Sequence, residues 1–377
     1  MRIGLVTHYM PPHLGGVEMV ARTLYEGYRA AGHEVRWVAS RVPRDAPRRD
    51  GDLVRVGCVN LAERFLDVPV PVWGLEGVAE IRRLVAWADA VHAQDLLYAG
   101  TTLAALWCPA LRTPLVITQH APFVVYPSRM LRGIQAAAYR SLGRFNAGRA
   151  AAVVAGTEGG QRVLEHAVGL PPDRIRRIGN GVNTDFFVPP SPTTRARLRQ
   201  ALGLRADRPV LLFVGRLAPR KGARRVWEVS THLPGFEFVM VGRGPLEGDL
   251  PERTPNLRRV AGASAESLRD LYQAADALLL PSRGEGFPLV VQEAMASALP
   301  VIARAEEPYA RALADAFLCR VFPEGDAAAE ATAIRALMGD PAGLRAMAGR
   351  ALEHARERFS RERQIRESLA LLAGVSA

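Results

Sequence analysis

Lysine is almost absent from this sequence. Of its 49 lysines and arginines, Lys221 is the single lysine, and it lies within GRLAPRKG at residues 215–222. An ammonium is a compact point charge with three donors, whereas a guanidinium is a flat fork, so a crowded site facing phosphate oxygens can accept the first and exclude the second. One lysine must also fall somewhere by chance. We interpret Lys221 as a phosphate contact.

Cysteine is scarce as well, and long apolar runs are missing. The 3 cysteines, Cys58, Cys108 and Cys319, lie far apart without Cys-x-x-Cys spacing, which argues against a disulfide framework or a zinc site and fits a reducing cytoplasm. The apolar run Ile3–Val6 is too short for a signal peptide, and no run approaches the roughly 18 residues that a spanning helix needs. We therefore expect a cytoplasmic protein, with any membrane contact peripheral and on the inner face of the plasma membrane.

What is present describes a globular protein biased toward anionic partners. The 377 residues are too many for one ordinary core, so two domains are the default. Hydrophobic residues make up 49% and charged residues 23%, as in soluble domains. The net charge of +11 favours anions, among which nucleotides, nucleic acid and anionic lipid all remain open.

Short apolar strands alternate with helical stretches in both halves of the chain. The first half begins with strand Ile3–Thr7, a loop rich in proline and glycine, and a helix from about Val17 to Ala31. The second half repeats the pattern with strand Val210–Val214 and the loop that holds Lys221. Such alternation predicts α/β domains with parallel sheets covered by helices on both faces. Further strands are expected at residues 34–39, 90–92, 115–118, 151–154, 237–241 and 277–280.

Turn and linker signals divide the chain near its middle. Residues 180–183 read Asn-Gly-Val-Asn, a turn signal, and residues 189–192 read Pro-Pro-Ser-Pro, a linker signal. We place one doubly wound domain at residues 1–182, a second at residues 183–355, and a C-terminal helix within residues 356–377 that returns toward the first domain. The two domains are expected to face across a cleft, because ligands of parallel sheets bind beyond the carboxyl ends of the strands.

The strongest constellation runs from Pro281 to Met295, where a buried strand feeds a Gly-rich turn and then a helix. Pro288 suits the first turn of that helix. The amides of Phe287, Leu289 and Val290 would then be donors at a positive helix end, which makes an anion site from backbone alone. The alternative is an ordinary surface loop.

Two glutamates flank this predicted anion site. Glu293 lies about 7.5 Å along the helix axis from Pro288, within reach of a ribose attached to a diphosphate at the helix end. Glu285 precedes the helix and would face the other side, toward a sugar. Carboxylates beside a diphosphate make sense as hydroxyl acceptors, although two solvated surface glutamates would give the same spacing.

These motifs resemble the retaining glycosyltransferases of family 4, the group 1 glycosyl transferases, over nearly the whole chain. The Glu285 to Glu293 spacing and the segment from Gly215-Arg216 to Lys221-Gly222 carry the resemblance. The segment 180–186 resembles the family's entry into its second domain, with Asn183 where the family usually has Asp. Residues 241–245 resemble its Gly-x-Gly-Pro turn, and residues 89–94 resemble its Asp-x-x-His-x-His segment, with Gln94 in place of the second histidine.

The resemblance implies a GT-B fold, in which two Rossmann-like doubly wound domains bind the acceptor and the nucleotide-sugar donor respectively. It implies transfer of a sugar, with retention, from a nucleotide diphosphate sugar (UDP favoured over GDP) to an acceptor hydroxyl of a glycolipid, polysaccharide or metabolite. No metal or other cofactor is required. The implied catalytic residues are His120, Arg216, Lys221 and Glu285. The implied donor-binding residues are Gly15, Gly16, Arg216, Lys221, Arg243, Gly244, Glu285, Gly286, Phe287, Pro288, Leu289, Val290 and Glu293.

The histidines differ in what they predict. His120 follows a strand, and the family places a histidine here near the donor sugar, although a loop histidine satisfied by its neighbours is the alternative. His92 is open between a site and a structural role. We expect His8 and His13 to be non-catalytic, and Glu18 to favour the dipole of the first helix.

Two further patterns suggest partners. Asp50-Gly51-Asp52 has the Asp-x-Asp pattern of metal-dependent transferases, but it follows a polar loop rather than a buried strand, and we interpret it as a turn. If residues 129–145 are helical, four arginines share one side, and Leu131 and Ile134 lie opposite. That helix predicts either contact with an anionic membrane surface or a helix whose apolar face packs on the sheet, and packing is favoured.

Two rival functions remain. One is a sugar-nucleotide epimerase or hydrolase on the same fold, which would act on a sugar nucleotide without an acceptor. The other is a nucleic-acid binder, suggested by the net charge of +11. Because the arginines are scattered and no basic run is interleaved with aromatic residues, we expect no nucleic-acid partner.

Overall fold

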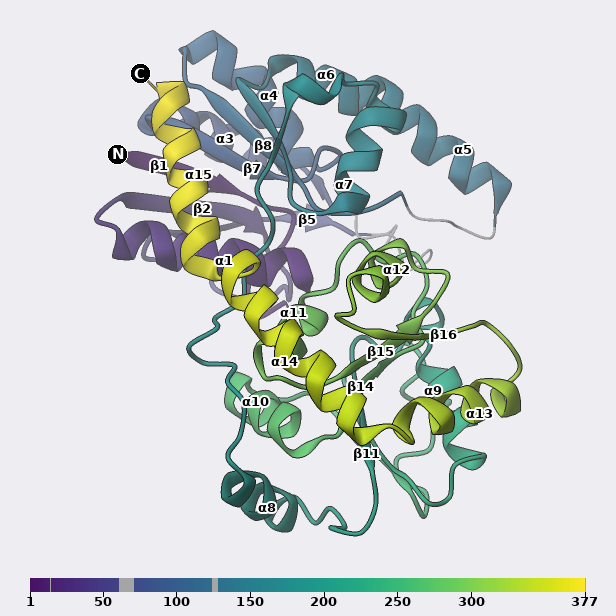
Figure 1. The fold of residues 1–377 in the computed structure, drawn as a ribbon. Helices are drawn as coiled ribbons and strands as arrows, with labels where there is room; N and C mark the ends of the chain where they lie inside the picture. Colours follow the sequence, from purple (N-terminus) through teal and green to yellow (C-terminus); the bar gives the residue numbers. More distant parts are fainter. Residues whose placement is uncertain (14, 61–70, 124–127, 377) are drawn as a thin grey trace. The chain divides into compact units, whose positions relative to one another are not determined.

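The computed structural model describes residues 1–13, 15–60, 71–123 and 128–376, and it divides into two compact units (Figure 1). Unit 1 comprises Met1–Asn180 and Arg361–Ala377, and unit 2 comprises Gly181–Ser360. The predicted boundary after residue 182 lies close to this division. The C-terminal helix runs from Arg361 to Ser376, inside the range 356–377, and residues 356–360 belong to unit 2.

Unit 1 holds an eight-stranded sheet in the order β10-β9-β8-β7-β1-β2-β4-β3. Every neighbouring pair is parallel except β3 with β4, and a small antiparallel ladder of β5 and β6 stands apart. The strands are β1 Arg2–Val6, β2 Glu34–Ser40, β3 Arg49–Asp50, β4 Leu53–Val56, β5 Cys58–Val59, β6 Val72–Trp73, β7 Ala90–Gln94, β8 Leu115–Gln119, β9 Ala152–Ala155 and β10 Ile175–Arg177. The helices are α1 Gly16–Ala30, α3 Leu75–Trp87, α4 Ala99–Leu111, α5 Arg129–Ala138, α6 Arg144–Arg149, α7 Glu158–Arg162 and α15 Arg361–Ser376.

The centre of this sheet is buried on both faces, as a parallel sheet requires. Every residue of β7 and of β8 is buried. Strand order reverses between β1 and β7, and such a switch point is where ligands of doubly wound sheets bind. The segments after β1 and β7 therefore mark the functional edge of unit 1.

Unit 2 holds a six-stranded parallel sheet in the order β13-β12-β11-β14-β15-β16. Alternate residues of β11 enter different cores, Val210 and Leu212 on one face and Leu211 and Phe213 on the other, so helices cover both faces. The strands are β11 Val210–Val214, β12 Glu237–Val241, β13 Leu257–Val260, β14 Ala277–Leu280, β15 Val301–Arg304 and β16 Arg320–Phe322. The helices are α8 Pro192–Ala201, α9 Ala223–Thr231, α10 Ala265–Ala274, α11 Leu289–Ala296, α12 Pro308–Asp315, α13 Ala327–Met338 and α14 Pro341–Arg358.

The arginine-rich helix departs from its prediction. Residues 129–149 are helical, but a π-helical turn at Tyr139–Gly143 separates α5 from α6. No residue of α5 is buried, and the helix projects from unit 1 in Figure 1. Packing of the apolar face therefore holds only at the far end of the predicted helix, where Phe145 packs against the core, whereas in α5 Ile134 is 57% exposed, and Met130 beside it is 68% exposed.

Two other features bear on function. Gly51, with φ +56°, and Asp52 turn the chain between β3 and β4, so the Asp-x-Asp segment forms a hairpin turn, as predicted. Within the described residues, no helix combines the length and apolar character that crossing a bilayer requires.

Candidate active site

Two loops meet at the switch point of unit 2. One follows β11 and holds Lys221, and we call it the lysine loop. The other joins β14 to α11, and we call it the donor loop after its predicted role. The amide of Arg283 donates to the carbonyl of Arg220 at 2.9 Å, and the Arg220 guanidinium donates to the carbonyl of Gly284 at 3.1 Å. Gly222, with φ +76°, lies so close to Pro281 that a Cβ there would come within 2.6 Å of its carbonyl oxygen. The backbones of the two loops therefore contact each other closely, and the absence of a side chain at residue 222 permits this approach.

Lys221 and Glu285 form an ion pair between these loops. The Lys221 Nζ lies 2.7 Å from Oε1 and 2.9 Å from Oε2 of Glu285. Glu285 is only 9% exposed, whereas Lys221 is 29% exposed. The sequence predicts that the lysine contacts phosphate and the glutamate the sugar, and the structure places the two side chains against each other.

The first turn of α11 faces the same loop. Pro288 is its N-cap residue, with φ −64°, and no side chain among the described residues caps the helix. Leu289 and Val290 begin the helix, and their amides have no partner within it. Gly286 is buried, and the Phe287 ring packs on Tyr309 and Phe359, with centroids 5.9 Å and 4.9 Å away. This packing fixes the approach to an N-terminus that suits an anion.

Glu293 lies one turn further along α11 and is partly buried. The Tyr272 hydroxyl donates to its Oε2 at 2.7 Å. Burial raises the pKa of Glu293 to about 7, and the tyrosine hydrogen bond opposes that rise. The surroundings of Glu293 therefore favour its protonated form more than water does. Tyr272 was not among the predicted site residues, because the pairing depends on how α10 packs against α11.

The loop after β12 supports the lysine loop from the other side. The amide of Leu217 donates to the carbonyl of Arg243 at 2.8 Å, and a Cβ on Gly244 would overlap the backbone of Leu217. The Arg243 side chain is 72% exposed and donates to the carbonyl of Ala261 at 2.8 Å. Arg216 is exposed on the lysine loop. The structure thus joins the backbones of the loops after β11 and β12, with the side chains of Arg216 and Arg243 at the surface.

His120 is buried at the carboxyl end of β8 in unit 1. Its Nε2 lies 2.6 Å from Oε1 of Gln94, at the end of the neighbouring strand β7. Asp95, with φ +62°, accepts from the amides of His120 and Ala121 at 2.7 Å and 3.2 Å. Burial lowers the pKa of His120, with the Asp95 carboxylate opposing that shift. The ring is therefore held neutral at the functional edge of unit 1. Asp95 was missed, because its backbone contacts depend on strand register.

Gly15 and Gly16 begin α1, and the buried Glu18 lies beside them in the first turn of the helix. Gly15 is the N-cap residue in extended conformation, and a Cβ on it would overlap the Glu18 carboxylate. Glu18 is 3% exposed, with Oε1 lying 3.1 Å from His13 Nδ1 and 3.4 Å from His8 Nε2. The imidazoles and backbone lower the pKa of Glu18, outweighing the opposing effect of its burial. Glu18 is therefore a buried partner of two histidines as well as an acidic residue in the first helical turn.

His92 has a structural role. It is 2% exposed, and its ring nitrogens lie 3.0 Å from the Tyr28 hydroxyl and 2.7 Å from the Thr118 hydroxyl. Burial lowers the pKa of His92 to about 3. A ring that is neutral and bonded on both sides within the sheet has no atom left for a ligand.

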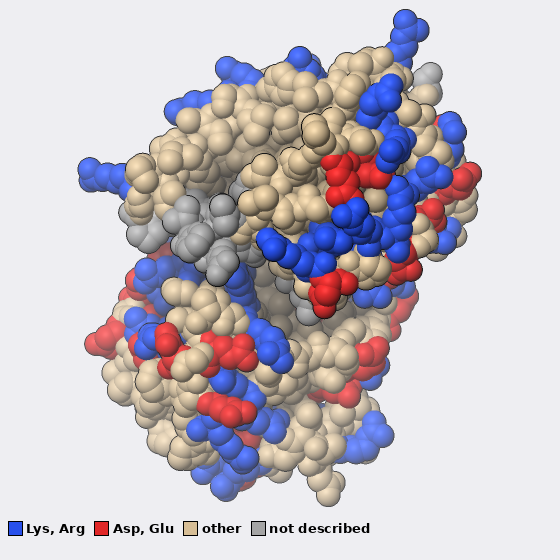
Figure 2. Space-filling view, turned by 180° about the vertical axis from the view of Figure 1, so that it is seen from behind, with Lys and Arg blue, Asp and Glu red and all other residues tan. Residues whose placement is uncertain are grey.

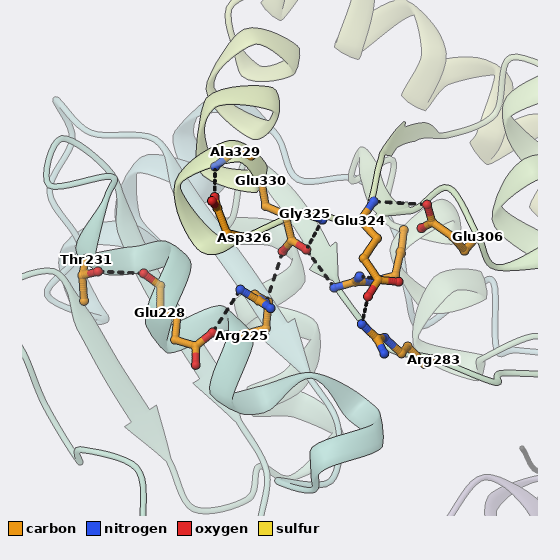
Figure 3. Close-up of polar contacts among 11 residues, drawn as sticks. Arg225, Glu228, Thr231, Arg283, Glu306, Glu324, Gly325, Asp326, Ala329 and Glu330 are labelled. Atoms are coloured by element: carbon orange, nitrogen blue, oxygen red, sulfur yellow. Dashed lines mark hydrogen bonds and ion pairs between the residues drawn. The ribbon is translucent and has the colours of Figure 1, made fainter. Parts of the chain in front are cut away.

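A second polar network lies beside the donor loop in unit 2 (Figure 3). Glu330 of α13 binds Arg304 at 3.0 Å, and both side chains are almost fully buried. Arg225 of α9 lies 3.6 Å from the other oxygen of Glu330. Glu324 lies 3.4 Å from Arg304 and also binds Arg283 of the donor loop. The network thus joins α9, α13 and the ends of β15 and β16 to that loop.

Surface charge and metal ligands complete the description. On the face seen in Figure 2, arginines are spread over both units and lie among acidic side chains, which differs from a continuous basic stripe. In the part of the chain that the structure describes, no three His, Cys, Asp or Glu residues are grouped to hold a metal ion.

Comparison with curated proteins gives relatives of one kind. The chain is 33% identical over 247 residues to a D-inositol 3-phosphate glycosyltransferase from Xylanimonas cellulosilytica, covering 60% of this chain and 58% of that protein. It is 29% identical over 366 residues to a GDP-mannose-dependent alpha-(1-6)-phosphatidylinositol monomannoside mannosyltransferase from Mycolicibacterium smegmatis, covering 91% and 83%. The chain spans little more than half the length of the first such relatives, at 58% and 54%.

Solved structures show the same fold. Sucrose-phosphate synthase from Thermosynechococcus elongatus matches with a TM-score of 0.78 at 21% identity, covering 99% of this chain and 98% of that one. Anabaena HepE in complex with UDP matches with a TM-score of 0.77 at 18% identity, covering 99% and 100%. These likenesses confirm the predicted α/β fold of the GT-B class.

Family profiles match both halves of the sequence. The profile described as Glycosyltransferase Family 4 matches residues 14–186, and that described as Glycosyl transferases group 1 matches residues 194–357. Together the two profiles take in most of the chain, which therefore belongs to glycosyltransferase family 4, as its motifs predicted.

Proposed function

We propose that the protein transfers a sugar from a nucleoside diphosphate sugar to an acceptor hydroxyl, with retention of anomeric configuration. The observation that carries this proposal is the pairing of Lys221 with Glu285 beside the uncapped N-terminus of α11. A helix end and an ammonium attract a diphosphate, and a buried carboxylate beside them can accept from sugar hydroxyls. Family membership supports the same reaction class.

Each residue of unit 2 has a separate task in this proposal. The amides of Leu289 and Val290, with Lys221 and Arg216, hold the diphosphate and stabilise the charge that builds up as the glycosidic bond breaks. Glu285 accepts from sugar hydroxyls. Glu293 accepts from the ribose. Arg243, Gly244, Gly286, Phe287 and Pro288 shape and support these loops. The leaving phosphate takes the acceptor proton, so no side chain acts as nucleophile.

Unit 1 is proposed to bind the acceptor. Gly15 and Gly16 offer a helix start without bulky side chains, and a Cβ on Gly16 would meet nothing within 4 Å. His120, held neutral and oriented by Gln94 and Asp95, is proposed to contact the donor sugar. No metal ion takes part.

Loss of Lys221 is the direct test. Lys221→Ala removes the single lysine while leaving the backbone contacts between the loops intact, so we expect transfer to fall by about 10²–10³-fold. Arg224→Ala is the matched control, because this nearby arginine of α9 is exposed and pairs with Asp249 at 3.3 Å. Transfer by Lys221→Ala at the level of Arg224→Ala would refute the proposal.

The base of the donor is proposed to be uracil. HepE has been solved with UDP, whereas the mannosyltransferase relative is named for GDP-mannose, so both must be tested. A thermal-shift screen compares UDP, GDP and ADP, since a ligand of the native state raises the melting temperature. A larger shift with GDP than with UDP would reverse the choice, and radiolabelled UDP- or GDP-sugars with candidate acceptors then identify the reaction.

We also propose that α5 binds an anionic membrane surface, at the inner face of the plasma membrane in a cytoplasmic setting. Met130 and Ile134 are exposed one turn apart on this projecting helix, beside Arg129 and Arg132. Apolar side chains flanked by arginines bind the headgroup region of anionic bilayers. The acceptor would then be lipid-linked, and a small-molecule acceptor is the alternative.

Vesicle flotation tests this surface. We expect the protein to float with vesicles that contain 30% anionic phospholipid, roughly the regime in which basic helices bind, and to remain at the bottom with neutral vesicles. Replacing Met130 and Ile134 together by serine should abolish flotation. Leu106→Ser is the control, because Leu106 is 49% exposed on another helix, α4. Equal flotation of all three proteins would exclude α5 as the contact.

A further inference from the structure

One buried carboxylate from outside the donor loop holds two successive amides of that loop. The amide of Gly284 donates to Oε1 of Glu307 at 2.7 Å, and the amide of Glu285 donates to Oε2 at 2.8 Å. Gly284 has φ +69°, which turns both amides toward the same point, as in the backbone concavities that bind anions. Glu307 is 4% exposed and is the N-cap residue of α12.

Burying the Glu307 carboxylate costs free energy, so we look for a role of this residue beyond the stability of the fold. Burial raises the pKa of Glu307, and the nearby Glu285 carboxylate raises it further, while the two amides oppose the shift. A buried carboxylate must be compensated by hydrogen bonds. Both amides that donate these hydrogen bonds belong to the donor loop, and one of them is the amide of Glu285 itself. Glu307 therefore fixes the backbone from which the Glu285 side chain reaches Lys221.

The residue before this pair is anchored separately. Arg283 binds Glu324, which also lies 3.4 Å from the buried Arg304 (Figure 3). The exposed Glu306 accepts from the amide of Glu324 at 3.1 Å. Two neighbouring glutamates thus accept backbone amides, but only Glu307 takes them from the loop that carries Glu285. Glu306 is a matched control for Glu307.

We propose that Glu307 is a positioning residue that acts through Glu285, setting where the Glu285 carboxylate meets Lys221 and the donor sugar. The proposal rests on the proposed function for its effect on catalysis. Because the amides of Gly284 and Glu285 are already bound to Glu307, diphosphate binding falls to the first turn of α11 and the cations. Loss of Glu307 should then impair turnover much more than nucleotide affinity.

Steady-state kinetics with a double-mutant cycle test this coupling. In Glu307→Gln one carboxylate oxygen is replaced by an NH2 group, which cannot accept the hydrogen bond from one of the two loop amides. We therefore expect kcat to fall by about 10–100-fold, the scale of a misplaced catalytic group. The Kd for UDP or GDP should stay within about twofold, since the helix end is unchanged. In a Glu285→Gln background, Glu307→Gln should add less than about threefold, because coupled residues are not additive. An undiminished effect in that background would overturn the proposal.

The single lysine supplies a readout that needs no catalysis. Reductive methylation with ¹³C-formaldehyde labels only the amino terminus and Lys221, and it keeps the lysine charge. We expect the Lys221 methyl resonance to move in Glu307→Gln and in the shorter Glu307→Asp, and to stay in place in Glu306→Gln. A resonance that coincides with wild type in both Glu307 variants would overturn the positioning role. If wild type transfers no sugar but the resonance moves as expected, the proposed function fails and the positioning of the ion pair stands.

Discussion

Replacing Glu293 by glutamine should stabilise the ligand-free protein at high pH while weakening donor binding. Burial raises the pKa of Glu293 from 4.5 to about 7 in the folded protein. The folded state therefore holds this proton more tightly than the unfolded state. The group contributes stability below about pH 4.5, and that contribution is lost as the pH rises through about 7. Glutamine never ionises, and it can still accept from the Tyr272 hydroxyl.

The magnitude follows from the size of the shift. A rise from 4.5 to about 7 corresponds to about 3 kcal/mol at about 1.4 kcal/mol per pH unit, which is an upper bound. Because Glu293 is only partly buried, solvent screening lowers this to about 1–2 kcal/mol. For a unit of this size the melting temperature changes by about 2–4 °C per kcal/mol. We expect unit 2 of Glu293→Gln to melt roughly 2–8 °C above wild type at pH 8.

Thermal unfolding from pH 4.5 to pH 8.5, with and without nucleoside diphosphate, is the assay. The difference between Glu293→Gln and wild type should be near zero at pH 4.5, grow up to about pH 7, and then level off. With UDP or GDP present the order should invert, because a neutral amide accepts less strongly from a ribose hydroxyl than a carboxylate does. Glu252→Gln is the control, since Glu252 is an exposed glutamate of the same unit. A destabilisation by Glu293→Gln that is the same at every pH would refute the reasoning.

Two further predictions concern the framework of unit 2. Gly222→Ala and Gly203→Ala each place a Cβ at positive φ, which costs roughly 1–2 kcal/mol of conformational strain in both variants. Of the two, only the Cβ at Gly222 also meets backbone, that of Pro281, so Gly222→Ala should lower the free energy of unfolding, measured in urea, by more than Gly203→Ala does. Equal losses of stability would show that the two loops can separate freely. Arg304→Met alone should destabilise unit 2 by about 3–5 kcal/mol, because it leaves Glu330 buried without its closest cation. Adding Glu330→Leu should recover most of that loss of stability, and scanning calorimetry measures both changes. A double variant less stable than the single one would contradict this account.

Many strands could be predicted because their signals are local. The apolar runs at Val210–Val214 and 277–280 are buried throughout or nearly so, and glycines follow each of them. Residue type and spacing within one or two elements also selected Lys221 and Glu285, which the structure brings together, while their role in the site stays a prediction. Strand β13 gave no such signal, because Arg258 and Arg259 interrupt its apolar run and its residues after Leu257 are only partly buried.

What could not be predicted depends on long-range packing. Glu307 reaches the amide of Glu285 from 22 residues further along the chain, and no spacing rule covers that contact. Glu18 was interpreted from helix position alone, whereas the fold of the loop after β1 places His8 and His13 against it. His92 lies inside β7 and His120 directly after the neighbouring strand β8, and their positions along these strands leave His92 enclosed within the sheet and His120 at its carboxyl end.

The path of the chain has a consequence for its synthesis. Helix α15 follows unit 2 in the chain but packs on α1, where a Cβ on Gly27 would come within 2.2 Å of Ile365 Cδ1, and Tyr28 of α1 hydrogen-bonds to Ser368. Unit 2 is continuous, so it can fold as soon as its own residues have left the ribosome. Unit 1 is discontinuous, so it begins first but lacks the α15 contacts with α1 until unit 2 and then α15 have been synthesised.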